Sequence, residues 1–272
     1  MKKTSRRVLC AATALLAACA TARNYTYPEG PLYAGVAASP ARDADTLKVV
    51  AFNMQYAIHV GRTVALLRQN PALSNPDIVL LQEMDGPGVR AIADSLGFGY
   101  IYFPAMLDPV TKRDFGNAIL SRYPIENQRK IILPHLGRFI RSQRAAVGAT
   151  IRVGERRIRV YSVHLATFTE AGPNVRRAQL AAVLADADTF AVVVLGGDFN
   201  SGTVPEIALA HGFSWPTRNL GHTEAFWDMD HILLKGLTLA GGLATGLVRE
   251  NQGASDHRPV WARFVLPAEP TP

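Results

Sequence analysis

Acids, amides and two histidines border apolar runs at six places in this sequence. They are Asn53 after LKVVAF, Glu83 after DIVLLQ, His164 after RVYSV, Asp198 and Asn200 after AVVVLGG, Asp230 at the start of DHILL, and Asp256 with His257 before RPVWARF. A half-buried carboxylate is costly unless it is paired or binds a metal, so six such places are hard to assign to unrelated turns. Together these residue types could hold a metal ion, accept a proton and donate hydrogen bonds, which is the chemistry of a hydrolytic site.

Each of these residues also has a simpler interpretation when it is taken alone. Asn53 could be a turn residue, Glu83 could be solvated at a strand end, and His164 could be an ordinary core or surface histidine. Asp230 could form a surface pair with its neighbour, and the Asp-His pair at 256–257 could cap a strand through an Asx turn. It is the combination of all six places that favours one shared site.

The segment AVVVLGGDFNS at 191–201 is the most specific of these features. Its apolar run predicts a buried strand that ends at the glycine pair. Asp198 and Asn200 stand two residues apart, so an extended chain would point both toward one side while Phe199 turns into the core. This spacing predicts that both polar side chains serve the same site.

The elements that would position these residues can also be read from the sequence. Helical periodicity is found around 62–68 and at 174–187. Alternation on both sides of Gly154-Glu155 predicts a hairpin of 145–153 with 157–164. Apolar, β-branched runs predict further strands at 47–52, 77–81, 117–121, 191–195, 231–234 and 260–265. Hairpins and strand–helix–strand units in one domain predict α/β layers around buried sheets.

Seven short motifs follow one another along the chain. They are FNM at 52–54, DIVLLQE at 77–83, GNAILSRYPI at 116–125, SVHL at 162–165, GGDFN at 196–200, MDHIL at 229–233 and SDHRPV at 255–260. In content and order they resemble the endonuclease/exonuclease/phosphatase superfamily, which includes DNase I, exonuclease III, sphingomyelinases and inositol polyphosphate 5-phosphatases. The resemblance covers the chain from about residue 48 to 264. It implies a four-layer α/β sandwich of two packed mixed sheets with helices outside, and a site where the strand ends gather.

The resemblance implies a divalent cation at this site, and the residue types agree with it. Mg²⁺ prefers oxygen ligands and uses only one or two carboxylates, and Mn²⁺ is an alternative. Glu83 is the expected main ligand with Asn53 beside it, and Asp256 is a candidate second ligand. The lack of a cysteine or multi-histidine cluster argues against zinc.

The resemblance also implies catalytic roles for the other polar residues. Asp198 would orient or deprotonate the attacking water, although His257 is an alternative base, and the sequence leaves this choice open. Asp230 would align His257 as its carboxylate partner. Asn200 would donate to the phosphoryl oxygens, and His164 would bind phosphate or assist the leaving group.

Two further residues are candidates for substrate binding. Arg144 stands where relatives often carry a basic residue, although it could equally be one more exposed arginine beside Arg138 and Arg141. Asn117 is a candidate support of the site.

Two departures from the superfamily pattern bear on the substrate. Relatives that cut DNA at abasic sites have an Asn-containing turn where this chain has SVHL, and a tyrosine where it has Arg113-Asp114-Phe115. Abasic-site repair is therefore not expected, while nucleic acid, phospholipid and inositol phosphate substrates stay open. Residues 107–111 and 136–140 are candidate substrate loops, and no long aromatic-tipped hairpin for lipid insertion is evident.

The N-terminus has the pattern of an export signal. MKKTSRR is basic, and the apolar run at 8–18 is too short to span a bilayer, which needs about 20 residues. LAAC at 16–19 resembles a bacterial lipobox, which implies lipidation of Cys19 and a lipoprotein anchored in the cell envelope. Ala20 favours the outer membrane, with the domain facing the periplasm. The alternative is an ordinary secretory signal with an incidental cysteine.

We therefore expect a signal peptide over 1–18, a lipidated cysteine and tether over 19–46, one domain over 47–266 and a tail over 267–272. The signal carries four basic residues and no acid, so the net charge of +7 falls to +3 without it. Such a small excess is no signature of nucleic-acid binding on its own. Both cysteines precede the domain, which excludes a disulfide framework and a thiol nucleophile there. We expect a monomer.

Two other functional classes compete with an enzyme. A binding lipoprotein could keep this fold without catalysis, although the full set of polar residues argues against that. A surface adhesin could use the arginines between 152 and 159 to bind acidic polymers, although their alternation also suits a solvated strand face.

Overall fold

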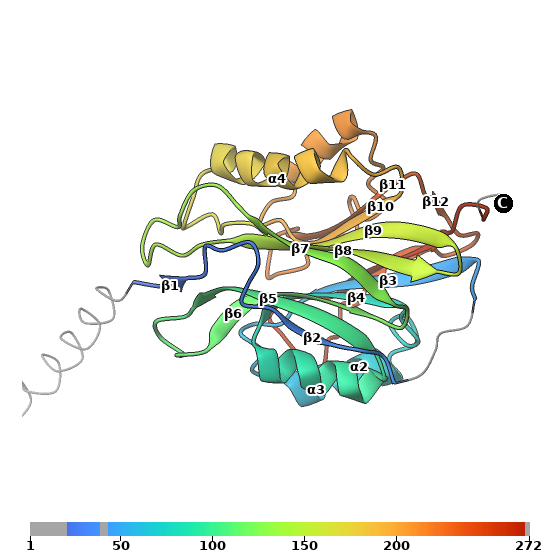
Figure 1. The fold of residues 1–272 in the computed structure, drawn as a ribbon, viewed down its shortest axis with the longest axis horizontal. Coiled ribbons are helices and arrows are strands. Elements are labelled where there is room, and N and C mark those ends of the chain that lie inside the picture. The colour runs from blue at the N-terminus through green and yellow to red at the C-terminus, as the bar shows by residue number, and fades with distance from the viewer. Residues whose placement is uncertain (1–20, 39–42, 270–272) are drawn as a thin grey trace, which may run out of the picture.

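Two β-sheets packed face to face form the centre of the molecule in a computed structural model, which describes residues 21–38 and 43–269 (Figure 1). Helices α2 and α3 cover the outer face of one sheet, and α4 covers the outer face of the other. This is the predicted four-layer α/β sandwich. The signal segment and Cys19 lie outside the described residues.

The first sheet has nine strands, with β5, β6, β4, β3 and β14 side by side at its centre. β3 and β4 run parallel, and the other central pairs are antiparallel. The central strands are β3 (Thr46–Asn53), β4 (Ile78–Met84), β5 (Gly99–Leu107), β6 (Asp114–Ser121) and β14 (Val260–Val265). Four short strands extend the edges: β1 (Arg23–Asn24), β2 (Tyr33–Gly35), β12 (Thr238–Leu239) and β13 (Thr245–Leu247).

The second sheet has five strands in the order β11-β10-β9-β8-β7. Its strands are β7 (Ile125–Ile132), β8 (Ala145–Val153), β9 (Arg156–His164), β10 (Val193–Asp198) and β11 (Asp230–Lys235). β8 and β9 form the predicted hairpin, with Gly154 in the left-handed conformation at its turn. β9 and β10 are parallel, because α4 (Pro173–Ala187) connects them across the outer face.

Three apolar clusters hold the layers together. One lies between the sheets, where both inner faces contribute alternate residues. A second lies under α2 (Val60–Gln69) and α3 (Gly86–Leu96), and a third lies under α4 and a 3₁₀-helix at Val204–His211. Over residues 21–38 and 43–269, the helices are all too short or too polar to cross a membrane.

The strand register brings the polar strand ends together. In the second sheet His164 pairs with Asp198, and Asp198 pairs in turn with Asp230. In the first sheet Asn53 pairs with Gln82, at the matching ends of β3 and β4. The two sets face each other, since the Asn53 side chain donates to Asp198 across the sheet interface at 2.9 Å. One end of the sandwich therefore carries nearly all of the predicted residues.

The described part of the segment predicted as a tether over 19–46 is docked on the first sheet. Within its described part, β1 and β2 pair with the edge strand β5. Tyr25 donates to Asp114 at 2.8 Å, and the buried Lys130 ammonium donates to the carbonyl of Gly30 at 3.0 Å. Strands of two and three residues leave no periodic signal in a sequence, which is why this docking was missed.

Two of the four arginines between 152 and 159 also differ from expectation, whereas Arg157 is exposed as predicted. Arg156 and Arg159 are buried rather than on a solvated face. Arg159 pairs with Asp186 at 3.2 Å, and its guanidinium lies over the rings of Tyr161 and Phe190. These side chains are occupied within the fold, which argues against the adhesin hypothesis.

Candidate active site

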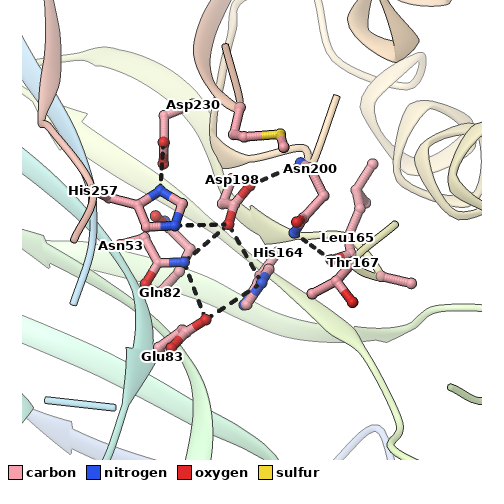
Figure 2. Close-up of polar contacts among 12 residues, drawn as sticks. Asn53, Gln82, Glu83, His164, Leu165, Thr167, Asp198, Asn200, Asp230 and His257 are labelled. Atoms are coloured by element: carbon pink, nitrogen blue, oxygen red, sulfur yellow. Dashed lines mark hydrogen bonds and ion pairs between the residues drawn. The ribbon is translucent and has the colours of Figure 1, made fainter. Parts of the chain in front are cut away.

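Asp198 lies at the centre of the polar cluster (Figure 2). Its Oδ2 accepts from the side-chain amide of Asn53 at 2.9 Å, and its Oδ1 accepts from the backbone N–H of Asn200 at 2.8 Å. The ring Nε2 atoms of His164 and His257 lie 3.5 and 3.9 Å from Oδ2. Burial and the neighbouring Asp230 raise the pKa of Asp198 to about 7.

Asp230 and His257 form a buried pair beside this carboxylate. The Nδ1 atom of His257 lies 2.7 Å from Oδ2 of Asp230. Burial disfavours the charged ring, but Asp230 outweighs burial and raises the pKa of His257 to about 10. His257 is thus an imidazolium at neutral pH. The other oxygen of Asp230 is buried and has no hydrogen-bond partner among the described residues.

Glu83 reaches the cluster from the first sheet. It lies within an irregularity of β4 between Leu81 and Met84, and its φ of 57° is in the left-handed region. Such a break redirects a side chain that regular pleating would place elsewhere. One oxygen accepts from Asn53 at 3.3 Å, and the other accepts from the backbone N–H of Tyr56 at 3.1 Å. Burial raises the pKa of Glu83 above its usual value, although Arg144 opposes this.

Arg144 and His164 form the opposite wall of the site. The Nη1 atom of Arg144 lies 3.0 Å from both ring nitrogens of His164, so the guanidinium lies over the ring face rather than at one nitrogen. Burial, and then the charge of Arg144, hold the pKa of His164 well below its usual value. His164 is therefore neutral. Arg144 is buried, contrary to the alternative of one more exposed arginine.

The turn after β10 differs from the extended geometry expected from the sequence. Asn200 has a φ of 50°, and its side-chain amide donates to the carbonyl of Leu165 at 3.0 Å. Phe199 is buried under the outer helices, as predicted. Gly197 has a φ of 138°, and a Cβ there would lie 2.1 Å from the carbonyl oxygen of Val163. Only glycine allows β9 and β10 to approach so closely where Asp198 is placed.

Two predicted residues border the cluster without contacting Asp198. Asn117 is buried, and its amide donates to the carbonyls of Ala145 at 2.8 Å and Ser162 at 3.4 Å, so it joins β6 to β8 and to the strand that carries His164. Asp256 is exposed, and its carboxylate accepts from the Ser255 hydroxyl at 3.2 Å. The structure does not bring Asp256 into contact with Glu83 or Asn53.

The metal-binding geometry differs from the predicted set of Asn53, Glu83 and Asp256. Among the described residues, the acid and histidine group with ligand atoms within 4.8 Å of one another is Asp198, Asp230 and His257. We favour the Glu83 side of the cluster nonetheless, because His257 is positively charged there and already engaged with Asp230. Oxygens of Glu83 and Asp198 converge on one amide nitrogen of Asn53, and both carboxyls have raised pKa values. Two converging carboxylates whose pKa values stay raised despite Arg144 and His257 fit a divalent cation, because its charge would stabilise both in their ionised form.

Two supporting residues were not assigned to the site from the sequence. Glu170 accepts from Arg144 at 2.6 Å and also from Ser142, so it fixes the guanidinium over His164. Gln82 donates to Ser162 at 2.9 Å and links β4 to β9 behind the site. Gln82 could have been noticed, because it precedes Glu83 at a strand end, but Glu170 lies in a loop with no pattern around it.

Comparison with known proteins agrees with this geometry. The model of the Endonuclease/Exonuclease/phosphatase family matches residues 50–257. The chain belongs to this family. A comparison with curated proteins gave no match.

Many solved structures share the fold of this family member. An endonuclease/exonuclease/phosphatase from Beutenbergia cavernae superimposes with a TM-score of 0.67 and 19% identity over 84% of this chain and 74% of that one. D. rerio TDP2 complexed with single strand DNA product has a TM-score of 0.64 and 16% identity, over 81% of this chain and 99% of that one. The human Nocturnin catalytic domain with bound sulfate anion has a TM-score of 0.62 and 18% identity, over 83% of this chain and 97% of that one. At these identities the likeness shows the fold alone.

Proposed function

We propose that the protein is a metal-dependent hydrolase of phosphate esters, acting as a phosphodiesterase, nuclease or phosphatase. The observation that carries the proposal is the set of contacts around Asp198, which one amide and two histidines from both sheets approach within 3.9 Å. Membership of the Endonuclease/Exonuclease/phosphatase family supports the same chemistry.

Mg²⁺ is the proposed cofactor, with Mn²⁺ as an alternative. A bound divalent cation would neutralise phosphate charge and polarise the ester. Glu83 would be the main ligand. The side-chain NH₂ of Asn53 donates to the carboxylates of Glu83 and Asp198, and its oxygen accepts from the N–H of Gln55 at 3.1 Å. The amide would therefore have to rotate before its oxygen could bind the cation. Asp256 is exposed beside the site and remains a proposed outer ligand.

The pKa values support Asp198 as the base, a choice that the sequence leaves open. A group with a pKa of about 7 can take a proton from water and release it again near neutral pH. His257 is held protonated by Asp230, so it would donate to a phosphoryl oxygen instead. Asn200 would add its remaining amide hydrogen to the same oxygens.

Arg144 and His164 would act on the opposite side of the phosphate. The guanidinium stays charged in its pair with Glu170 and would bind a phosphoryl oxygen. His164, being neutral, keeps one ring nitrogen as a donor for the phosphate or the leaving group.

We further propose that the protein is a monomeric lipoprotein of the cell envelope, facing the periplasm and sorted to the outer membrane. The support is the lipobox-like LAAC at 16–19, which also sets the proposed boundary between the signal over 1–18 and the exported chain. Labelling with radioactive palmitate should vanish in Cys19→Ser. Label that persists in this variant would show that the lipobox assignment is wrong.

A panel assay tests the enzymatic proposal. Bis-p-nitrophenyl phosphate, DNA, RNA, sphingomyelin and inositol phosphates would be offered to wild type, Asp198→Ala and Asp188→Ala, with Mg²⁺ or EDTA. We expect hydrolysis that EDTA abolishes and that Asp198→Ala lowers about 10²- to 10⁴-fold, while the surface control Asp188→Ala stays active. Turnover in EDTA, or full activity in Asp198→Ala, would refute the mechanism. Absence of turnover on every ester would favour a catalytically inactive binding lipoprotein.

A further inference from the structure

The exposed phenylalanines and tryptophan gather at one end of the molecule. Within residues 21–38 and 43–269, the Phe and Trp side chains that are exposed are Phe139 (68%), Phe168 (59%), Phe226 (81%) and Trp227 (54%). All four lie on loops at the site end of the second sheet. We call these four residues the apolar rim. Scattered exposed apolar residues are ordinary, but a gathering of large rings next to a polar site indicates a binding surface.

Two rim residues belong to a turn that is fixed to the site. Residues 223–227 form a tight hairpin, with the N–H of Trp227 donating to Glu224 at 2.6 Å. The N–H of Arg258, next to His257, donates to the carbonyl of Thr223 at 2.6 Å. The tip of this turn is a run of three exposed apolar residues, Ala225-Phe226-Trp227. This turn is an aromatic-tipped hairpin, but it is too short to be recognised in the sequence.

The other two rim residues are joined to the same surface. Phe168 lies four residues after His164, and its ring centre is 6.1 Å from that of Trp227. Phe139 lies in the loop between β7 and β8, which is tied to the Phe168 loop because the N–H of Arg138 donates to the carbonyl of Glu170 at 3.1 Å. A ring contact and a backbone hydrogen bond thus join the loops that carry the rim, at the same end of the sheet as the site.

Basic side chains accompany the rim. Arg138 and Arg141 flank Phe139 in sequence, and both are exposed. Neither forms an ion pair with another described residue. Exposed arginines beside exposed aromatic rings suit a partner with an apolar interior and an anionic outer layer, such as a lipid bilayer.

The described chain begins at this same rim. The N–H of Ala22 donates to the carbonyl of Ile140 at 2.8 Å, and the Asn24 side chain donates to the carbonyl of Arg141 at 2.8 Å. β1 lies at the left end of the sandwich in Figure 1, away from the turn between β8 and β9. Cys19 is three residues before Ala22, a distance that an extended chain spans in about 11 Å at most. An acyl chain on Cys19 would therefore enter a bilayer beside Phe139.

We propose that the apolar rim docks on a phospholipid surface, and that the phosphate ester taken by the site belongs to a lipid headgroup. The substrate part of this proposal rests on the proposed function. Aromatic rings and arginines are the side chains that settle at a lipid–water boundary. Docking at this boundary would turn the site toward the lipid headgroups. Water would add to phosphorus and the P–O bond to an alcohol would break. The alcohol would leave with the proton that the water gave up.

A nucleic-acid strand fits the rim less well. The Phe168 and Trp227 rings contact each other, so a base cannot enter between them. Phe226, at the tip of its turn, is the most exposed of the four rim rings. Such a projecting apolar tip can be buried by acyl chains more completely than by a base.

Vesicle binding tests the docking surface. The full chain carrying Cys19→Ser, which has no acyl chain, would be sedimented with vesicles of phosphatidylcholine containing phosphatidylglycerol. We expect Phe226→Ser with Trp227→Ser to lower the partition coefficient about tenfold or more, because burial of each ring contributes substantially to binding. The matched control is Val36→Ser with Leu243→Ser, which removes two side chains that are 94% and 78% exposed away from the rim and should leave partition unchanged. Equal thermal midpoints for all variants would show that the fold is intact.

The outcomes separate the two proposals. Equal vesicle binding by wild type and the rim variant, or no binding by either, would overturn the docking surface. If the rim variant lost affinity for single-stranded DNA and kept its affinity for vesicles, the rim would be assigned to nucleic acid. That result would overturn the proposal as well. Hydrolysis of soluble bis-p-nitrophenyl phosphate by wild type tests the proposed function independently, since it needs no surface. A protein that docks but hydrolyses no ester would keep the docking surface and lose the proposed function.

Discussion

Two Asp–His pairs in this protein have the same geometry and opposite surroundings. Asp230 and His257 at the site, and Asp188 and His211 on the surface, each join Oδ2 to Nδ1 over 2.7 Å. The site pair is almost completely buried, whereas more than a third of each surface side chain is exposed. The hydrogen bond from His211, followed by smaller effects, lowers the pKa of Asp188. At the site, Asp230 raises the pKa of His257 to about 10.

The comparison shows that contact distance alone does not make a functional pair. Water around Asp188 and His211 screens their attraction, and side-chain freedom offsets much of the rest. At the site the protein replaces water, so the charge of His257 is held in place and directed at Asp198. The predictions that follow use the surface pairs as controls for the buried ones.

The largest effect is expected from removal of the buried carboxylate. Asp230→Asn should lower kcat/KM for bis-p-nitrophenyl phosphate about 10²- to 10⁴-fold, because His257 would lose its proton near neutral pH and no longer donate to the phosphate. Asp188→Asn should leave kcat/KM unchanged. Steady-state kinetics at saturating Mg²⁺ would measure both. Equal losses in the two variants would mean that burial is not what distinguishes the pairs.

A smaller effect is expected from the ion pair that holds Arg144. Glu170→Gln should lower kcat about tenfold, because a guanidinium without its partner would leave its position over His164. The same variant should lose about 3 kcal/mol of unfolding free energy, as expected when one partner of a buried pair is removed.

The exposed pair of Arg218 with Glu206, at 3.1 Å, provides the control for Glu170. Glu206→Gln should change neither kcat nor unfolding free energy measurably. If Glu170→Gln lowered stability and left kcat unchanged, Glu170 would be a purely structural residue.

The last expected effect is a pH dependence of stability. The pKa of His257 is raised from about 6.5 in an unfolded chain to about 10 in the folded one. Its contribution is therefore fully present below pH of about 6.5 and is lost as pH rises through about 10. The stability difference between wild type and Asp230→Asn should thus be larger at pH of about 6 than at pH of about 10 in urea unfolding. A difference that grows with pH would contradict the charged state of His257.

Much of this site could be predicted from sequence because its residues lie at strand ends. The strands over 47–52, 77–81 and 191–195 are strongly apolar, so their ends are visible, and the register of the sheets brings those ends together. Asn53, Glu83 and Asp198 therefore meet as expected.

The remainder depends on chain conformations that leave no periodic signal. α3 begins with GPG, which resembles a loop, but Asp85 caps it by accepting from Gly88 at 2.8 Å. β5 contains Pro104 at an irregularity, and β7 has a polar, exposed middle. Glu170 acts through a loop, and the exposure of Asp256 depends on the turn before β14. Such features follow from tertiary contacts rather than from pattern.

The pairing of β1 and β2 with β5 also determines where the folded unit begins. A recombinant form starting at residue 47, where the apolar pattern begins, would leave β5 as a long unpaired edge. Open edges of this kind recruit strands from neighbouring molecules and lead to self-association. The stretch 21–38 thus also shields the sheet from its own copies, so purified versions of the enzyme should retain it.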